Sequence, residues 1–114
     1  MNQDNLKTLT EEYTKAFDNK DINSLKSMLT EDFILEDPVV QKVVGRENAL
    51  KKILEIFNGA EKLSFQAKNI YQEGNTTMIE FNLTLDDVKL KGVDILDWEQ
   101  DKIKQLRAYL DIPK

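Results

Sequence analysis

Three residues combine a hydrogen-bonding or ionisable side chain with a position on an apolar face: Tyr13, Asp37 and Asp94. Asp37 follows Phe33 and Leu35 at strand spacing, so alternation places it on the face that we expect to look into the core. A carboxylate there is costly unless it is paired, hydrogen-bonded or neutralised. A positioned carboxylate, with hydroxyl and acid donors opposite it, can remove a proton beside a carbonyl group and stabilise the oxyanion that forms.

Each of the three residues also has a structural interpretation. Asp37 precedes Pro38, and an Asp-Pro pair often forms a turn in which the carboxylate accepts hydrogen bonds from backbone N–H groups. Tyr13 can fill the core while its hydroxyl binds a backbone group. A strand irregularity near Gly92 can turn Asp94 outward. Three inward polar groups in one small core nevertheless favour a pocket.

The composition excludes several other chemistries. The chain has 114 residues, 40% of them hydrophobic and 32% charged, which is typical of one folded domain over residues 1–114. It has no histidine and no cysteine, so zinc sites, serine–histidine triads and thiol chemistry are excluded. We expect neither a metal site nor a cofactor. A chain without cysteine suits a reducing cytoplasm.

The charge distribution narrows the class of partner. The net charge is −5, the sequence pI is about 4.8, and basic residues form no block. This argues against nucleic acid or an anionic membrane as the partner. No apolar run approaches the length of a membrane span, and residues 1–9 lack the regions of a signal peptide. We therefore expect a cytoplasmic protein.

Apolar residues at helical spacing predict three helices in the first half of the chain. The first covers residues 4–18. Asp21 can cap a short second helix whose apolar stripe ends at Leu29. Gly45 opens a third helix, which stops at residues 58–59.

The remaining segments have the spacing of strands. Residues 33–37 form a short strand, and we expect an irregular segment over residues 39–44. From residue 63 onward apolar residues alternate, with tight turns predicted at residues 74–75 and 86–87. The residues that share one face of each strand are Leu63, Phe65 and Ala67, then Ile79, Phe81, Leu83 and Leu85, then Val88, Leu90, Leu96 and Trp98, and last Leu106, Ala108 and Leu110. Three helices followed by a strand meander predict an α+β fold, in which the helices pack on one side of a curved, mainly antiparallel mixed sheet.

Inward-facing apolar residues of these elements are expected to surround the three polar groups and to bind a small hydrophobic ligand. They are Phe17, Phe33, Leu35, Phe57, Phe81, Leu96, Trp98, Leu106 and Ala108. Met78, Val93 and Ile95 fall on the opposite face of the sheet. An apolar group on a sheet exterior is usually covered by a partner, so we expect a homodimer through this face.

The sequence resembles the SnoaL-like and ketosteroid isomerase branch of the nuclear transport factor 2-like superfamily over nearly its whole length. The resemblance rests on Tyr13, residues 21–29, Glu36-Asp37-Pro38-Val39, Gly45, Asp94 and Leu106-Arg107-Ala108-Tyr109. It implies a cone-shaped, cystatin-like roll of three helices against a curved sheet, with an apolar cavity open at one end.

The resemblance also implies roles for the site residues. In the isomerases the residue matching Asp37 is the general base, and those matching Tyr13 and Asp94 form the oxyanion hole, the acid being kept neutral. This implies a ketosteroid isomerase-like protein that transfers a proton on a small hydrophobic ketone without a cofactor. The alternatives are a SnoaL-like cyclase or dehydratase, and a non-catalytic ligand-binding or protein-association module of the same fold.

Overall fold

The computed structural model describes residues 5–37 and 41–111, without the side chains of Asp37, Gln41 and Asp111. Within these residues the chain forms three helices and six strands, which confirms the predicted α+β class. Their order is α1 (Leu6–Asp18), α2 (Ile22–Met28), β1 (Leu29–Asp37), β2 (Gln41–Val44), α3 (Arg46–Gly59), β3 (Leu63–Glu73), β4 (Thr76–Leu85), β5 (Val88–Glu99) and β6 (Lys102–Asp111).

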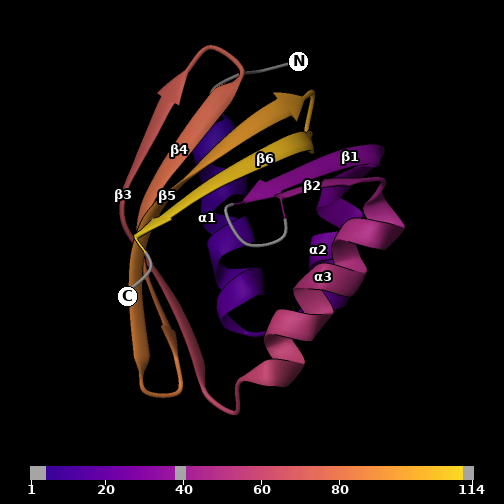
Figure 1. Ribbon diagram of the computed structural model, residues 1–114. Coiled ribbons are helices and arrows are strands. Elements are labelled where there is room, and N and C mark those ends of the chain that lie inside the picture. The colour runs from indigo at the N-terminus through magenta and orange to yellow at the C-terminus, as the bar shows by residue number, and fades with distance from the viewer. Residues whose placement is uncertain (1–4, 38–40, 112–114) are drawn as a thin grey trace.

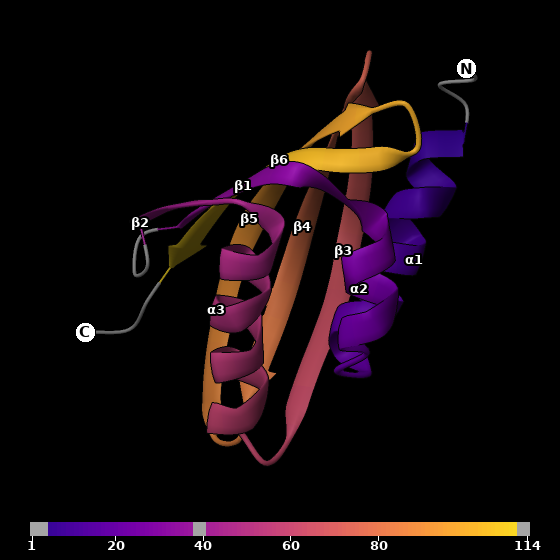
Figure 2. The same ribbon diagram turned by 90° about the vertical axis from the view of Figure 1, so that its right-hand side faces the viewer.

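The strands pair in the order β2-β1-β6-β5-β4-β3. Neighbours from β3 to β6 are antiparallel, and β1 is antiparallel to β2 but parallel to β6. The sheet is curved, and α1, α2 and α3 all lie against one of its faces (Figures 1 and 2). The mixed sheet with helices on a single side therefore agrees with the prediction.

The predicted starts of the second and third helices are confirmed, and the first helix begins at Leu6. Before α2, the Asp21 carboxylate accepts a hydrogen bond from the Ser24 hydroxyl at 2.7 Å and from the Ser24 backbone N–H at 3.2 Å. Both bonds lower the pKa of the Asp21 carboxyl group. Before α3, Gly45 has a φ of +98°, a conformation that costs glycine least.

One strand was not expected. Residues 41–44 form β2, so the prediction of an irregular segment was wrong for them, and residues 38–40 lie outside the described part of the chain. β2 is a short edge strand paired only with β1 in the described sheet. Its sequence, Gln-Lys-Val-Val, does not alternate between polar and apolar residues, which is why the pattern missed it.

Three residues depart from their predicted surroundings at element ends or irregularities. Leu29 begins β1 instead of ending the second helix, although it is buried as expected. Ala67 was grouped with Phe65 on one face of its strand, and it keeps the register of Phe65, but it is exposed; the register shifts directly after it, between Ala67 and Asn69. Val88, also grouped with inward residues, is 50% exposed where β5 begins.

The hydrophobic core lies between the helices and the concave face of the sheet. A buried hydrogen-bonded chain crosses it from β5 to α1. Trp98 Nε1 donates to Thr77 Oγ1 at 2.8 Å, the hydroxyl oxygens of Thr77 and Thr10 are 2.8 Å apart, and Thr10 donates to the Leu6 carbonyl at 2.6 Å. Because a hydroxyl has one hydrogen, Thr77 must be the donor to Thr10. Every member of this chain is therefore satisfied.

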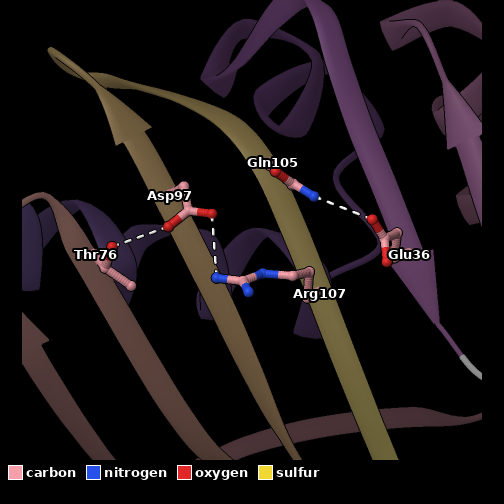
Figure 3. A network of polar contacts seen from close by, with 5 residues as sticks. All are labelled: Glu36, Thr76, Asp97, Gln105 and Arg107. Atoms are coloured by element: carbon pink, nitrogen blue, oxygen red, sulfur yellow. Dashed lines mark hydrogen bonds and ion pairs between the residues drawn. The ribbon is translucent and has the colours of Figure 1, made fainter.

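The convex face of the sheet carries a polar network that spans four strands (Figure 3). Asp97 accepts a hydrogen bond from Thr76 at 2.9 Å and pairs with Arg107 at 3.3 Å. Gln105 donates to Glu36 of β1 at 3.1 Å. These contacts tie β1 to the antiparallel part of the sheet. In the described residues no helix has the length and apolar character needed to cross a membrane.

Candidate functional site

A pocket of about 70 Å³ lies between the helices and the concave face of the sheet. Of the described residues that line it, two have polar side chains: Tyr13 of α1 and Asp94 of β5. The apolar lining residues are Phe17, Leu25, Leu29, Phe33, Leu35, Ile53, Ile56, Phe65, Phe81, Leu83, Leu106, Ala108 and Leu110. The pocket therefore presents two hydrogen-bonding groups in an apolar surround.

Aromatic side chains position Tyr13. Its ring is 4% exposed and lies 6.1 Å from the Phe17 ring and 6.3 Å, edge-on, from the Phe65 ring, measured between centroids. Burial raises the pKa of the Tyr13 hydroxyl well above its usual value, and the nearby Asp94 raises it further. The hydroxyl therefore remains protonated near neutral pH and can donate a hydrogen bond.

Asp94 points into the molecule and is 4% exposed. It lies opposite Ile79 of β4 and Ala108 of β6, and the register between β4 and β5 runs without a shift along both strands. No irregularity between these two strands therefore turns Asp94 outward, and that alternative was wrong. Asp97, three residues later, lies on the convex face instead.

Gly92 shapes the pocket next to Asp94. It lies opposite Phe81, which lines the pocket. A Cβ atom at position 92 would collide with the Tyr109 carbonyl oxygen, and it would come within 2.9 Å of Phe81 Cζ and 3.0 Å of Leu110 Cδ2. Because Gly92 has no side chain, there is room for the Phe81 ring beside it.

Asp37 is described only by its backbone. It is the last residue of β1 and pairs with Gln41 of β2. Leu35, two residues earlier in the strand, lines the pocket. The Asp37 side chain lies outside the described part of the structure, so its place at the pocket stays a prediction.

The other predicted lining residues fall into two groups. Phe17, Phe33, Leu35, Phe81, Leu106 and Ala108 line the pocket. Phe57, Leu96 and Trp98 are buried but lie elsewhere in the core. Phe57 packs edge-on against Phe17 with centroids 5.1 Å apart, and Trp98 belongs to the buried hydrogen-bonded chain.

Several lining residues were not expected at the pocket. Phe65, Leu83 and Leu110 were placed on inward strand faces by their alternation, and this signal could have found them. Ile56 was not named, although it lies three residues after Ile53 and on the same side of the third helix, so helical spacing could have found it as well. A pocket of 70 Å³ is also far below the roughly 300–1,000 Å³ of sites for drug-sized ligands. A cavity that holds a ligand thus remains a prediction.

The arrangement can hold one electronegative atom of an otherwise apolar molecule. Tyr13 supplies a hydroxyl donor, and Asp94 supplies either a donor or an acceptor according to its protonation. Over residues 5–37 and 41–111, no cluster of three or more acidic side chains could hold a metal ion. The polar groups of the pocket are thus suited to a carbonyl or hydroxyl oxygen.

The sequence matches the family model of the SnoaL-like domain over residues 10–106. The chain belongs to the SnoaL-like domain family. Tyr13, Asp37 and Asp94 all lie inside the matched region of this SnoaL-like domain. No curated protein matches the sequence.

Solved structures share the fold of this SnoaL-like domain. A candidate ketosteroid isomerase from Kribbella flavida is 19% identical, with a TM-score of 0.83 over 94% of this chain and 78% of that one. A candidate SnoaL-like polyketide cyclase from Shewanella putrefaciens is 17% identical, with a TM-score of 0.82 over 97% and 91%. An LEH-like epoxide hydrolase from M. tuberculosis is 16% identical, with a TM-score of 0.76 over 91% and 80%. At these identities the likeness establishes the NTF2-like fold alone.

Proposed function

We propose that this SnoaL-like domain binds a small uncharged carbonyl compound and transfers a proton on it, in the manner of a ketosteroid isomerase. The observation that carries the proposal is the meeting of Tyr13 and Asp94 in one apolar pocket. Two donors directed at one oxygen are what an enolate requires, and their effect is strongest where water is excluded. The candidate isomerase among the structures with this fold is consistent with that chemistry.

The proposed reaction uses three side chains. Ionised Asp37 removes a proton from the carbon next to the carbonyl group, and the electrons move onto the oxygen. The Tyr13 hydroxyl and protonated Asp94 donate hydrogen bonds to this enolate oxygen. Asp37 then returns the proton to the far carbon of the adjacent double bond, so that a β,γ-unsaturated ketone becomes an α,β-unsaturated one.

The size of the pocket favours a compact substrate. A volume of about 70 Å³ is too small for a molecule with several fused rings. A monocyclic or short-chain enone needs much less rearrangement of the side chains. We therefore place the substrate among small ketones such as 3-cyclohexenone.

The same residues support a second reaction, the elimination of water from a β-hydroxy ketone. It begins with the same proton abstraction and the same enolate, and it corresponds to the cyclase or dehydratase alternative. The candidate polyketide cyclase among the similar structures supports this second reaction as an alternative. A non-catalytic module would bind the ketone and leave it unchanged.

The test is an ultraviolet assay for conjugated enone with 3-cyclohexenone and with a β-hydroxy ketone as substrates. We expect Asp37→Asn to lower the rate by about 10²- to 10⁴-fold, because the amide cannot accept the proton. Tyr13→Phe should lower it by about 10²- to 10³-fold, because one oxyanion donor is lost. Asp97→Asn is the matched control, since Asp97 is an acid of the same strand as Asp94 on the opposite face.

Two results would contradict the proposal. Equal losses in Asp97→Asn and Asp37→Asn would mean that the effects come from the fold. A wild-type protein that binds ketones but converts neither substrate would be a ligand-binding module. A melting point several degrees lower in Asp37→Asn would then indicate that Asp37 forms the turn before Pro38.

A further inference from the structure

Two hollows of the molecule meet at the side chain of Ile56. The buried pocket of about 70 Å³ is lined by Ile56, and so is a surface groove of about 490 Å³. The groove lies between the end of α3 and the turn from β4 to β5. Its other lining residues are Gly59, Ala60, Leu85, Asp86, Asp87 and Val88.

The pocket and the groove follow the same two elements. On α3, Ile53 lines the pocket, Ile56 lines both spaces, and Gly59 lines the groove, at a spacing that keeps the three residues on one side of the helix. On β4, Leu83 lines the pocket and Leu85, the next residue on that face, lines the groove. Both spaces thus lie along one seam between α3 and β4, whose far ends lie at the same end of the molecule (Figure 2).

Hydrogen bonds hold the outer end of this seam. The Asp86 carboxylate accepts from the backbone N–H groups of Lys62 at 2.8 Å and Glu61 at 3.3 Å. In the same loop, which connects α3 to β3, the Ala60 carbonyl accepts a hydrogen bond from Lys20 Nζ at 2.6 Å. The wall of the groove is therefore fixed by the fold, while the half-buried Ile56 is an aliphatic side chain that has rotamers.

We propose that Ile56 divides a single ligand channel and sets the length of the chain that the site accepts. The inference rests on the proposed function for the head of the ligand, whose carbonyl oxygen is bound by Tyr13 and Asp94. The rest of the ligand is an uncharged aliphatic chain that passes Ile56 and lies between Leu85 and Val88. A chain ending in a carboxylate is disfavoured, because Asp86 and Asp87 lie at the exit.

The test measures affinity against chain length for two series of probes, methyl ketones and n-alkylbenzenes, by calorimetry. While the chain fills apolar space, each added methylene should increase the affinity about fourfold. We expect this increase to stop after a short chain in the wild type. It should continue over several more carbons in Ile56→Ala and stop earlier in Ile56→Trp.

Ile53→Ala is the matched control. It makes the same change one turn earlier on the same helix, at a residue that lines the pocket but not the groove. Ile53→Ala enlarges the pocket only by the carbons removed from the side chain. The longest accepted chain can therefore grow only by a few carbons. Methyl resonances of Val88 should shift on binding of long probes to Ile56→Ala and remain unchanged in Ile53→Ala.

The two probe series separate this inference from the proposed function. If Ile56→Ala extends the limit for alkylbenzenes while ketones have no advantage over them, the channel is supported and the carbonyl site is not. If ketones bind through Tyr13 but Ile56→Ala and Ile53→Ala have the same limit, the channel is wrong. Failure of Ile56→Ala to bind either series would also overturn it.

Discussion

The Tyr13 hydroxyl lies where water has almost no access, and this determines its acid–base behaviour. Burial disfavours the phenolate, and a carboxylate at Asp94 would disfavour it further. Ionising Tyr13 inside the folded protein is therefore much harder than ionising a tyrosine side chain in water. A donor that never ionises near neutral pH is suited to binding an oxyanion.

This burial predicts how stability depends on pH. The folded pKa of Tyr13 is above the unfolded value of about 10, so above that pH the unfolded state loses a proton that the folded state keeps. Stability contributed by neutral Tyr13 is complete below about pH 10. It then falls by up to about 1.4 kcal/mol per pH unit until the folded pKa is reached.

Urea unfolding at several pH values between about 9 and 11 checks this prediction. The wild type should lose stability more steeply than Tyr13→Phe, which has no phenol to ionise at this position. Parallel curves for the wild type and Tyr13→Phe would contradict the prediction.

The positions of Tyr13 and Asp94 could be predicted because each depends on local geometry. The period of a helix or a strand decides which residues lie on the same face of that element, and this does not depend on the elements packed against it. These patterns do not decide which inward residues reach a pocket. Phe57, Leu96 and Trp98 point inward like the lining residues, but side chains from other elements cover them.

At the scale of single elements, β5 depends on the glycine at position 92. An added methyl group at Gly92 would collide with the backbone carbonyl of Tyr109 and crowd the side chains of Phe81 and Leu110. We expect Gly92→Ala to destabilise the fold by about 1–3 kcal/mol, the usual cost of overpacking. Gly59→Ala is the control, because nothing lies within 4 Å of a Cβ atom there, and it should be neutral or slightly stabilising. Equal stability of the two variants in urea would contradict this.

The contact between α1 and the sheet depends on the hydroxyl of Thr77. In Thr77→Val, which keeps the shape, the buried Trp98 N–H loses its acceptor, and we expect a loss of about 1–3 kcal/mol. Thr77→Ser keeps the hydroxyl and should lose less. Thr84→Val, on the convex face of β4, should remain within about 0.5 kcal/mol of the wild type. A Ser variant less stable than the Val variant would mean that packing of the methyl group matters more than the hydrogen bond.

The elements predicted from the sequence are those that carry one regular period. The helices and β3 to β6 have enough apolar residues for the period to be recognised. β2 has four residues at an edge, and the register shift in β3 interrupts its alternation. The parallel pairing of β1 with β6 has no local signal at all, because it depends on two segments about seventy residues apart in the chain.

At the scale of the whole molecule, we propose that two copies pair through the convex face of the sheet. Met78, Ile95 and Arg107 are consecutive partners across β4, β5 and β6, and Val93 lies opposite Tyr109 in the next row. The same face carries both signs of charge at Asp97 and Arg107. A second copy related by a twofold axis can therefore cover the apolar groups of this face with the same groups of its own.

Sedimentation velocity over a range of concentrations tests this pairing. The wild type should sediment as a dimer and Ile95→Lys as a folded monomer, since a buried lysine without a partner is costly. Leu54→Lys, at a partly exposed position on α3, should remain dimeric. A monomeric wild type at high concentration would contradict the proposal.

The pairing of β1 with β6 has a consequence for how the chain folds. Until residues 102–111 have been synthesised, β1 has only the short β2 beside it in the described sheet, and a two-stranded hairpin is marginally stable. Pairing β1 with β6 must then close a loop of about seventy residues, and such long-range pairing forms more slowly than local contacts. During synthesis one edge of β1 therefore remains unpaired until β6 is available. That edge can pair with strands of other nascent chains.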